Sequence, residues 1–290
     1  MASPSRNNQL VFDLTQKGQP QYQFSSNGKT VIEPSLMGFE FKDIQKMTEG
    51  FKVIKTEVNA VDQTWEQPWG EFRRVRDRHN ELIVHLKENE GEQRLVDLIF
   101  RVFDDGLGFR YSFPAQPNLG KVKIPNEITQ FSFPQDHDVW SIPVHRDNSY
   151  YESTYKKTRL SQTDTINTPA TFETKDNLFV AIHEANLTDF ASMTLLKSDG
   201  NRYKSDLVPW ADGVKVYAQA PFQTPWRTII VGSKPGDLVT STLMLNLNEP
   251  SKIEDESWIS TSKYAGIWWG MHLEKFTWGQ GPKHGATTKN

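Results

Sequence analysis

A histidine and a glutamate stand side by side at the end of a predicted strand, in the segment Ile182-His183-Glu184-Ala185. Successive side chains of a regular strand point to opposite faces, so the imidazole and the carboxylate cannot reach the same ligand. A carboxylate at the mouth of a cleft would suit a hard cation or a proton transfer. The structural alternative is an exposed Glu184 beside a half-buried His183, and the pair taken alone favours that alternative.

A second polar cluster lies between Trp69 and Glu81. It combines an aromatic ring, the guanidinium of Arg76, the amide of Asn80 and several carboxylates. Sugars offer apolar ring faces for stacking and hydroxyls for bidentate polar groups, so such a mixture could bind a carbohydrate. A solvated strand edge with many ion pairs has the same composition, and the cluster taken alone favours this structural interpretation.

Aromatic residues are concentrated in the last stretch of the chain, residues 263–290. Four large rings fall within eleven residues, and two histidines accompany them: Trp268, Trp269, Phe276, Trp278, His272 and His284. Such rings are costly to leave in water. We predict a buried strand over 264–269, whose rings either pack onto the rest of the chain or line a pocket completed by other residues.

Composition excludes several classes of function. The 290 residues include 33 basic and 36 acidic side chains, so nothing resembles the basic surface of a nucleic-acid-binding protein. The absence of cysteine excludes disulfides, thiolate zinc sites and cysteine nucleophiles. No apolar run approaches the roughly 18 residues of a membrane helix, so we expect no membrane partner. Residues 1–8 lack the apolar region of a signal peptide, and we assign them no structural role.

The elements that must position these residues are short strands, separated by turn residues about every ten positions. Asn27-Gly28 predicts a hairpin turn, and Asp104-Asp105-Gly106 ends another strand. Residues 235–241 could form one short helical turn, and we predict a strand over 243–247. The pattern predicts an all-β fold, a large antiparallel two-sheet sandwich over residues 9–250, followed by a connection over 251–262.

Four blocks in a fixed order resemble glycoside hydrolase family 97. They are WEQPWGEFRRVRDRHNEL (65–82), FVAIHEANLTDFASM (179–193), TPWRTIIVGSKPGDLVTSTLMLNLNEP (224–250) and the GIWWGMH segment (266–272). The resemblance covers nearly the whole chain. It implies an N-terminal galactose-mutarotase-like β-super-sandwich over 9–250 and the truncated start of a catalytic (β/α)8 barrel over 263–290, with 264–269 as the first barrel strand.

The resemblance also implies a function and roles for individual residues. Members are calcium-dependent, exo-acting enzymes that cleave α-linked glucosides or galactosides, and by position Glu184 is the calcium ligand that the N-terminal domain supplies. Trp268, Trp269 and His272 would face the substrate at the C-terminal end of the first barrel strand. Arg76 and Asn80 are further substrate-binding candidates on the sandwich surface. The catalytic carboxylates would lie in the remainder of the barrel, which is the implied partner, so we expect none here and no activity from this chain alone.

The resemblance leaves several alternatives open. Glucoside or galactoside preference and an inverting or retaining course are not determined by these residues. We expect a bacterial periplasmic or extracellular enzyme, whose signal peptide is not present in this chain. A self-sufficient carbohydrate-binding module and a purely structural domain remain the competing interpretations.

Overall fold

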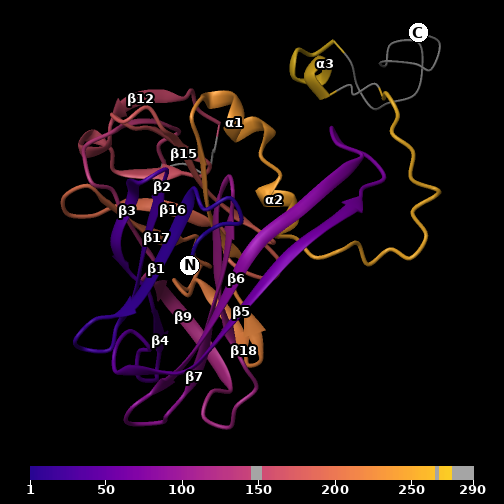
Figure 1. Cartoon of the computed structure of the whole chain (residues 1–290). Coiled ribbons are helices and arrows are strands. Elements are labelled where there is room, and N and C mark those ends of the chain that lie inside the picture. Colours follow the sequence, from indigo (N-terminus) through magenta and orange to yellow (C-terminus); the bar gives the residue numbers. More distant parts are fainter. Residues whose placement is uncertain (145–151, 265–267, 276–290) are drawn as a thin grey trace. The chain divides into compact units, whose positions relative to one another are not determined.

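The computed structural model describes residues 1–144, 152–264 and 268–275. The chain divides into two compact units. The first comprises Met1–Gln67 and Arg74–Pro250, and the second comprises Pro68–Arg73 and Ser251–Asn290. Antiparallel strands dominate the first unit, which confirms the predicted all-β class (Figure 1).

One face of the first unit is a seven-stranded sheet with the order β1-β2-β3-β10-β17-β16-β13. Its strands are β1 (Asn8–Leu14), β2 (Pro20–Ser26), β3 (Lys29–Leu36), β10 (Gln130–Ser132), β17 (Arg202–Leu207), β16 (Met193–Lys197) and β13 (Thr165–Asn167). Buried and half-buried residues alternate along β2, as a sheet with one face on the core requires.

The second large sheet has ten strands, nine of them in the order β12-β11-β14-β15-β20-β8-β7-β6-β5. They are β12 (Lys156–Arg159), β11 (Asp138–Ser141), β14 (Ala170–Glu173), β15 (Phe179–Ala185), β20 (Trp226–Gly232), β8 (Gly106–Phe113), β7 (Leu95–Phe103), β6 (Arg74–Glu88) and β5 (Phe51–Glu66). The tenth, β19 (Phe222–Gln223), pairs with β8, and a 3-10 turn, η1 (Leu160–Gln162), follows β12.

A third, three-stranded sheet has the order β18-β9-β4. It consists of β18 (Val216–Gln219), β9 (Lys121–Glu127) and β4 (Phe39–Lys42). The sequence pattern did not distinguish this small sheet from the two large ones. Its strand β9 ends at Glu127, which takes part in the buried network described in the next section.

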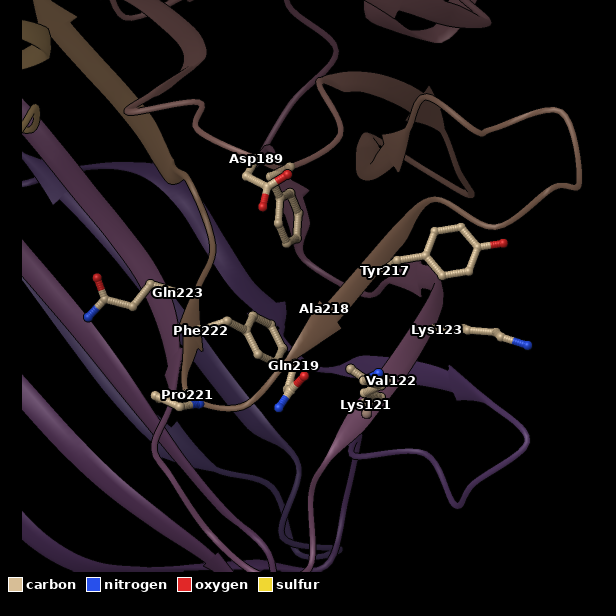
Figure 2. A pocket seen from close by; sticks show the side chains of 11 residues that line it. Lys121, Val122, Lys123, Asp189, Tyr217, Ala218, Gln219, Pro221, Phe222 and Gln223 are labelled. Carbon is tan, nitrogen blue, oxygen red and sulfur yellow. The ribbon is translucent and has the colours of Figure 1, made fainter.

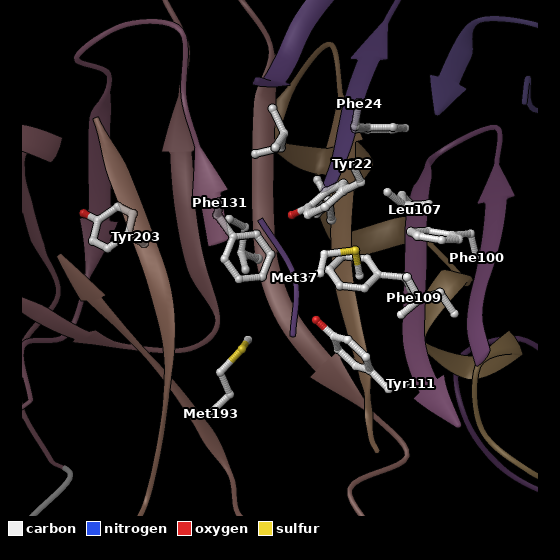
Figure 3. Close-up of a cluster of buried hydrophobic side chains, with 14 of the residues drawn as sticks. Tyr22, Phe24, Met37, Phe100, Leu107, Phe109, Tyr111, Phe131, Met193 and Tyr203 are labelled. Carbon is white, nitrogen blue, oxygen red and sulfur yellow. The ribbon is translucent and has the colours of Figure 1, made fainter. Parts of the chain in front are cut away.

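The core lies between the sheets and is rich in aromatic side chains (Figure 3). Tyr22 of β2 packs against Phe109 of β8, with ring centroids 4.8 Å apart, and Phe109 also contacts Phe100 and Phe131. These residues are almost fully buried. Offset and tilted ring pairs of this kind stabilise a core beyond the area they bury.

Two short helices, α1 (Pro235–Thr240) and α2 (Leu243–Asn246), contact β15 and cover part of the outer face of the ten-stranded sheet. Helix α1 confirms the predicted helical turn. The strand predicted over 243–247 is wrong, because Leu243 and Leu247 pack together against Trp226. Their spacing of four residues suits one face of a helix as well as it suits a strand.

The predicted turns are present. Asn27 and Gly28 both have positive φ angles, 50° and 74°, and join β2 to β3 as a two-residue hairpin turn requires. Gly106 follows Asp104-Asp105 at the turn between β7 and β8, with a φ of 156°.

The N-terminal residues have a structural role, contrary to the prediction from sequence. Asn8 begins β1 and donates its side-chain amide to the carbonyl oxygen of Phe103 at 2.9 Å. The terminal amino group of Met1 donates to the carbonyl oxygen of Leu10 at 2.6 Å. Polar residues pack here because backbone groups of neighbouring strands accept their hydrogen bonds, which a hydrophobicity pattern does not reveal.

The second unit differs from the predicted barrel strand. Residues 265–267 lie outside the described part, and Trp268–His272 form a short helix, α3. The described residues of this unit include no strand to pair with, whereas a helix makes its backbone hydrogen bonds within itself. Trp268 and Trp269 are 72% and 74% exposed. Across 1–144, 152–264 and 268–275, no helix has the length and apolar character to cross a membrane.

Candidate functional site

Glu184 is the sequence-predicted site residue with the most constrained surroundings. It lies on β15 directly opposite Arg227 of β20 and is only 7% exposed. Its Oε2 accepts a hydrogen bond from Arg227 Nη1 at 2.7 Å, and its Oε1 accepts one from the backbone N–H of Met193 at 2.9 Å. The structural alternative of an exposed glutamate is therefore wrong.

His183 faces away from this cluster, as the alternation of a strand predicts. It is half-buried, and its Nδ1 lies 3.0 Å from the hydroxyl of Thr168. Burial lowers the pKa of His183 below its ordinary value. The histidine and the glutamate thus have separate surroundings and do not share a ligand.

Arg227 joins Glu184 to a second carboxylate, that of Glu127 at the end of β9. Arg227 Nε donates to Glu127 Oε1 at 2.9 Å, and Nη2 donates to Oε2 at 2.5 Å. This two-pronged geometry is the strongest that a guanidinium and a carboxylate make. Arg227 is fully buried and Glu127 is 2% exposed.

Glu127 also accepts a hydrogen bond from one hydroxyl group, which a second hydroxyl contacts in turn. The Thr129 hydroxyl donates to Glu127 Oε1 at 2.7 Å and lies 2.7 Å from the Tyr111 hydroxyl, which in turn accepts the N–H of Gly38 at 3.2 Å. Burial, with the nearby Glu127 carboxylate, raises the pKa of Tyr111 well above its ordinary value, so this hydroxyl stays neutral. The network connects β8, β9, β15 and β20.

The network contains two carboxylates, those of Glu127 and Glu184, and one guanidinium, that of Arg227. Burial raises the pKa of Glu184 above its ordinary value, and Arg227 opposes that shift. Burial would lower the pKa of Arg227, but Glu127 and Glu184 together raise it, so the guanidinium remains charged. When both carboxylates are ionised, the three side chains carry one net negative charge.

The surroundings of Glu184 fit one ligand of a hard cation and no more. A carboxylate has about four lone-pair positions, and two of those on Glu184 are used by Arg227 and Met193. Calcium takes six to eight oxygen ligands. Within the part of the chain that the structure describes, no group of three or more His, Cys, Asp or Glu side chains is placed to hold a metal ion. Further ligands would have to come from elsewhere.

A hollow is lined by residues of β9, β18 and β19 and by Asp189 and Phe190 of the loop that follows β15 (Figure 2). Its volume is about 570 Å³, and its walls include Phe190, Tyr217 and Phe222. A neighbouring hollow of about 460 Å³ shares Phe190 and Tyr217 and includes Trp210. The guanidinium carbon of Arg227 lies 6.0 Å from the centre of the Phe190 ring, and Phe190 also lines both hollows.

The other sandwich candidates lie in a different place. Arg76 and Asn80 are both on β6, which β20, β8 and β7 separate from β15, a distance of roughly 19 Å at ordinary strand spacing. Arg76 makes two hydrogen bonds of 2.8 Å to Asp62, and Asn80 donates to the carbonyl oxygen of Ala2 at 2.9 Å. Their substrate-binding role stays a prediction.

The tail candidates belong to the second unit. Trp268, Trp269 and His272 are all in α3, and the rings of Trp268 and His272 lie 5.2 Å apart. Their role in substrate binding also stays a prediction. Phe276, Trp278 and His284 lie outside the described residues.

Sequence reasoning missed Glu127 and Arg227. The signal for Arg227 was present, because it is a lone charged residue within the apolar strand Trp226–Gly232, and a buried charge requires a partner. Nothing local identifies that partner. Glu127 is 100 residues away in the chain and lies in another sheet.

Comparison with known proteins agrees with this fold. Residues 1–250 match the family described as Glycosyl-hydrolase 97 N-terminal. The chain is 25% identical over 303 residues to a retaining alpha-galactosidase of Bacteroides thetaiotaomicron, covering 93% of this chain and 44% of the relative. It is 27% identical over 262 residues to a probable retaining alpha-galactosidase of Streptomyces bingchenggensis, covering 89% of this chain and 39% of the relative.

Solved structures show the same architecture. A family 97 enzyme from Pseudoalteromonas sp. strain K8, in complex with panose, has a TM-score of 0.93 and 42% identity, covering all of this chain and 44% of that one. The same comparison values hold for its complex with acarbose. A beta-arabinopyranosidase has a TM-score of 0.72 and 28% identity, covering 80% of this chain and 40% of that one. This chain thus spans less than half the length of these relatives. It belongs to glycoside hydrolase family 97, and residues 1–250 are the family's N-terminal domain.

Proposed function

We propose that this chain is the N-terminal part of a calcium-dependent α-glycosidase and that it supplies one cation ligand, Glu184, and one wall of the active site. The observation that carries the proposal is the family match over residues 1–250 in a chain that spans only 44% of its relatives. The family's chemistry needs two carboxylates flanking a glycosidic bond. We place both in the remainder of the enzyme.

Glu184 is suited to its role because it is ordered before any cation binds. Two hydrogen bonds fix its carboxylate, and the net negative charge of the network attracts a cation. A bound calcium ion would supply a concentrated positive charge beside the substrate. The contribution of this chain is to hold the Glu184 oxygens in place and to limit water around them.

The substrate we propose is an oligosaccharide with α-linked glucose, with α-linked galactose as the second candidate. The structure complexed with panose, a trisaccharide of glucose, is 42% identical to this chain, whereas the retaining alpha-galactosidase of Bacteroides thetaiotaomicron is 25% identical. We further propose a periplasmic or extracellular location in a bacterium, since both curated relatives are bacterial proteins.

A direct test measures the release of nitrophenol from aryl α-glucoside and α-galactoside by this chain and by the longer enzyme. We expect no turnover by residues 1–290, and a higher kcat/KM for the glucoside in the longer enzyme. Glu184→Gln in that enzyme should weaken calcium affinity and activity together. Glu90→Gln, at an exposed turn, is the matched control and should change neither. Turnover by the 290-residue chain, or full activity of Glu184→Gln, would contradict the proposal.

The second candidate function is carbohydrate binding by the sandwich itself. The hollow lined by Phe190, Tyr217 and Phe222 favours it, because aromatic rings beside polar side chains suit sugar faces. Calorimetric titration of maltose or melibiose into the 290-residue chain distinguishes the two functions. Millimolar or tighter binding that survives EDTA would support a binding module. No binding would favour the first function, an active site shared between this chain and the rest of the enzyme.

A further inference from the structure

Glu127 cannot touch a cation that Glu184 binds. Its side chain is fully enclosed, and both of its oxygens accept hydrogen bonds from Arg227. Glu127 nevertheless affects the net charge near a cation bound to Glu184 and the orientation of the Glu184 carboxylate. We propose that Glu127 is a positioning residue for the cation site, acting on Glu184 through Arg227. This inference rests on the proposed role of Glu184.

Arg227 links the orientation of Glu184 to that of Glu127. A guanidinium is planar, so two parallel hydrogen bonds to Glu127 fix the plane in which its remaining N–H groups point. One of those groups, on Nη1, reaches Glu184 Oε2 at 2.7 Å. The orientation of the Glu184 carboxylate therefore depends on Glu127, although the two glutamates do not bond to each other.

Glu127 is itself held by a buried hydrogen bond from Thr129. The Thr129 hydroxyl donates to Glu127 Oε1, and Thr129 is in turn linked through the Tyr111 hydroxyl to the backbone N–H of Gly38. Tyr111 and Thr129 are both buried, so water does not compete for these hydrogen bonds. The position of Glu184 is thus fixed from three sheets: from β8 and β20 in its own sheet, from β9, and through the Met193 N–H at the start of β16.

Glu127 also offsets the positive charge of Arg227. Without Glu127, the guanidinium would fully compensate the charge of Glu184, and a dication would approach a neutral pair. With Glu127 present, the network keeps one net negative charge close to the cation. In a site with a dielectric constant well below that of water, one charge within several ångströms changes ion affinity by at least about tenfold.

The test is a double-mutant cycle on calcium affinity, measured calorimetrically in the longer enzyme at neutral pH. Glu127→Gln should raise the calcium Kd at least about tenfold, because Arg227 then opposes the cation without compensation. The single variant Arg227→Gln and the double variant Glu127→Gln/Arg227→Gln complete the cycle, and their Kd values should be similar, because Glu127 acts on Glu184 through Arg227. A purely structural role for Glu127 would instead make the two losses additive.

Two further variants make every outcome informative. Thr129→Val keeps all charges and removes one anchor of Glu127, so we expect a Kd increase of only about two- to threefold. Glu184→Gln tests the ligand itself. Unchanged calcium affinity in Glu184→Gln would overturn the proposed function. Lost affinity in Glu184→Gln, with parental affinity in a cooperatively folded Glu127→Gln, would overturn the role of Glu127 alone. If Glu127→Gln fails to fold, a Kd of the double variant at least about tenfold above that of Arg227→Gln overturns that role.

Discussion

Arg227 is the residue on which the buried network depends. It is the single cation between two buried carboxylates, and its strand is otherwise apolar or hydroxyl-bearing from Trp226 to Val231. A buried ion pair gains little over an apolar substitute, but removing one partner leaves a charge without compensation. The cost of losing the arginine is therefore much larger than the net value of its hydrogen bonds.

We predict that Arg227→Met destabilises the sandwich by about 3–5 kcal/mol at neutral pH, as measured by urea unfolding. The loss should shrink as the pH falls through the raised pKa of Glu184, because protonation removes the uncompensated charge of the variant while the parent loses its ion pairs. Arg76→Met is the matched control, since its partner Asp62 is exposed, and it should change stability little. Equal effects of the two substitutions would contradict this account.

At the residue scale, the sequence singled out Glu184 as a candidate ligand, whose role stays a prediction, but it did not reveal the hydrogen-bond partners of Glu184. The Ile182–Ala185 segment carried a family resemblance, so Glu184 could be selected from many glutamates. The pairing of Glu127 with Arg227 depends on how two sheets meet, and strand periodicity carries no information about that meeting. The aromatic tail residues were predicted from their cost in water, yet Trp268 and Trp269 are exposed in this chain.

At the element scale, the turn between β7 and β8 determines whether the central strand of the large sheet can form. Gly106 has a φ of 156°, and β8 pairs there with β20 as well as with β7. A Cβ atom at Gly106 would overlap the carbonyl oxygen of Ile229 and approach Leu243 of α2. The turn, the neighbouring strand and the covering helix therefore all require glycine at this position.

Gly106→Ala should cost roughly 2–5 kcal/mol of unfolding free energy, from backbone strain and overpacking together. Gly28→Ala isolates the strain, because Gly28 also has a positive φ and nothing lies within 4 Å of the added atom. It should cost only about 1 kcal/mol. Thermal unfolding of both variants checks the difference, and similar midpoints would show that the close approach of β20 is unimportant.

Elements fixed by local chemistry were predictable, and elements fixed by long-range packing were not. The Asn27-Gly28 hairpin and α1 follow from turn and helix-start residues that lie next to each other in sequence. The run at 243–247 fits both a strand and a helix, and packing of Leu243 and Leu247 against Trp226 favours the helix. The third sheet pairs β4 with β9, which are some eighty residues apart, and no local signal specifies that pairing.

At the scale of the whole molecule, the sandwich contains a carboxylate network in which every charged group is paired. The cation site of the proposed function, by contrast, has only one of its ligands in this chain. Every charged group of the network has its partner, yet Glu184 presents only part of what a cation needs. The relatives extend to more than twice the length of this chain. In the proposed function, the remaining ligands and both catalytic carboxylates lie in the part of the relatives that this chain does not span.

The most direct test of this central claim is a crystal structure of the longer enzyme grown with calcium. We predict an ion about 2.3–2.6 Å from an oxygen of Glu184, with Arg227 still bound to Glu127 and the other carboxylate ligands contributed by residues beyond 290. A calcium ion with no contact to Glu184, or a Glu184 bonded only to Arg227 and Met193 in the calcium-loaded enzyme, would contradict the account.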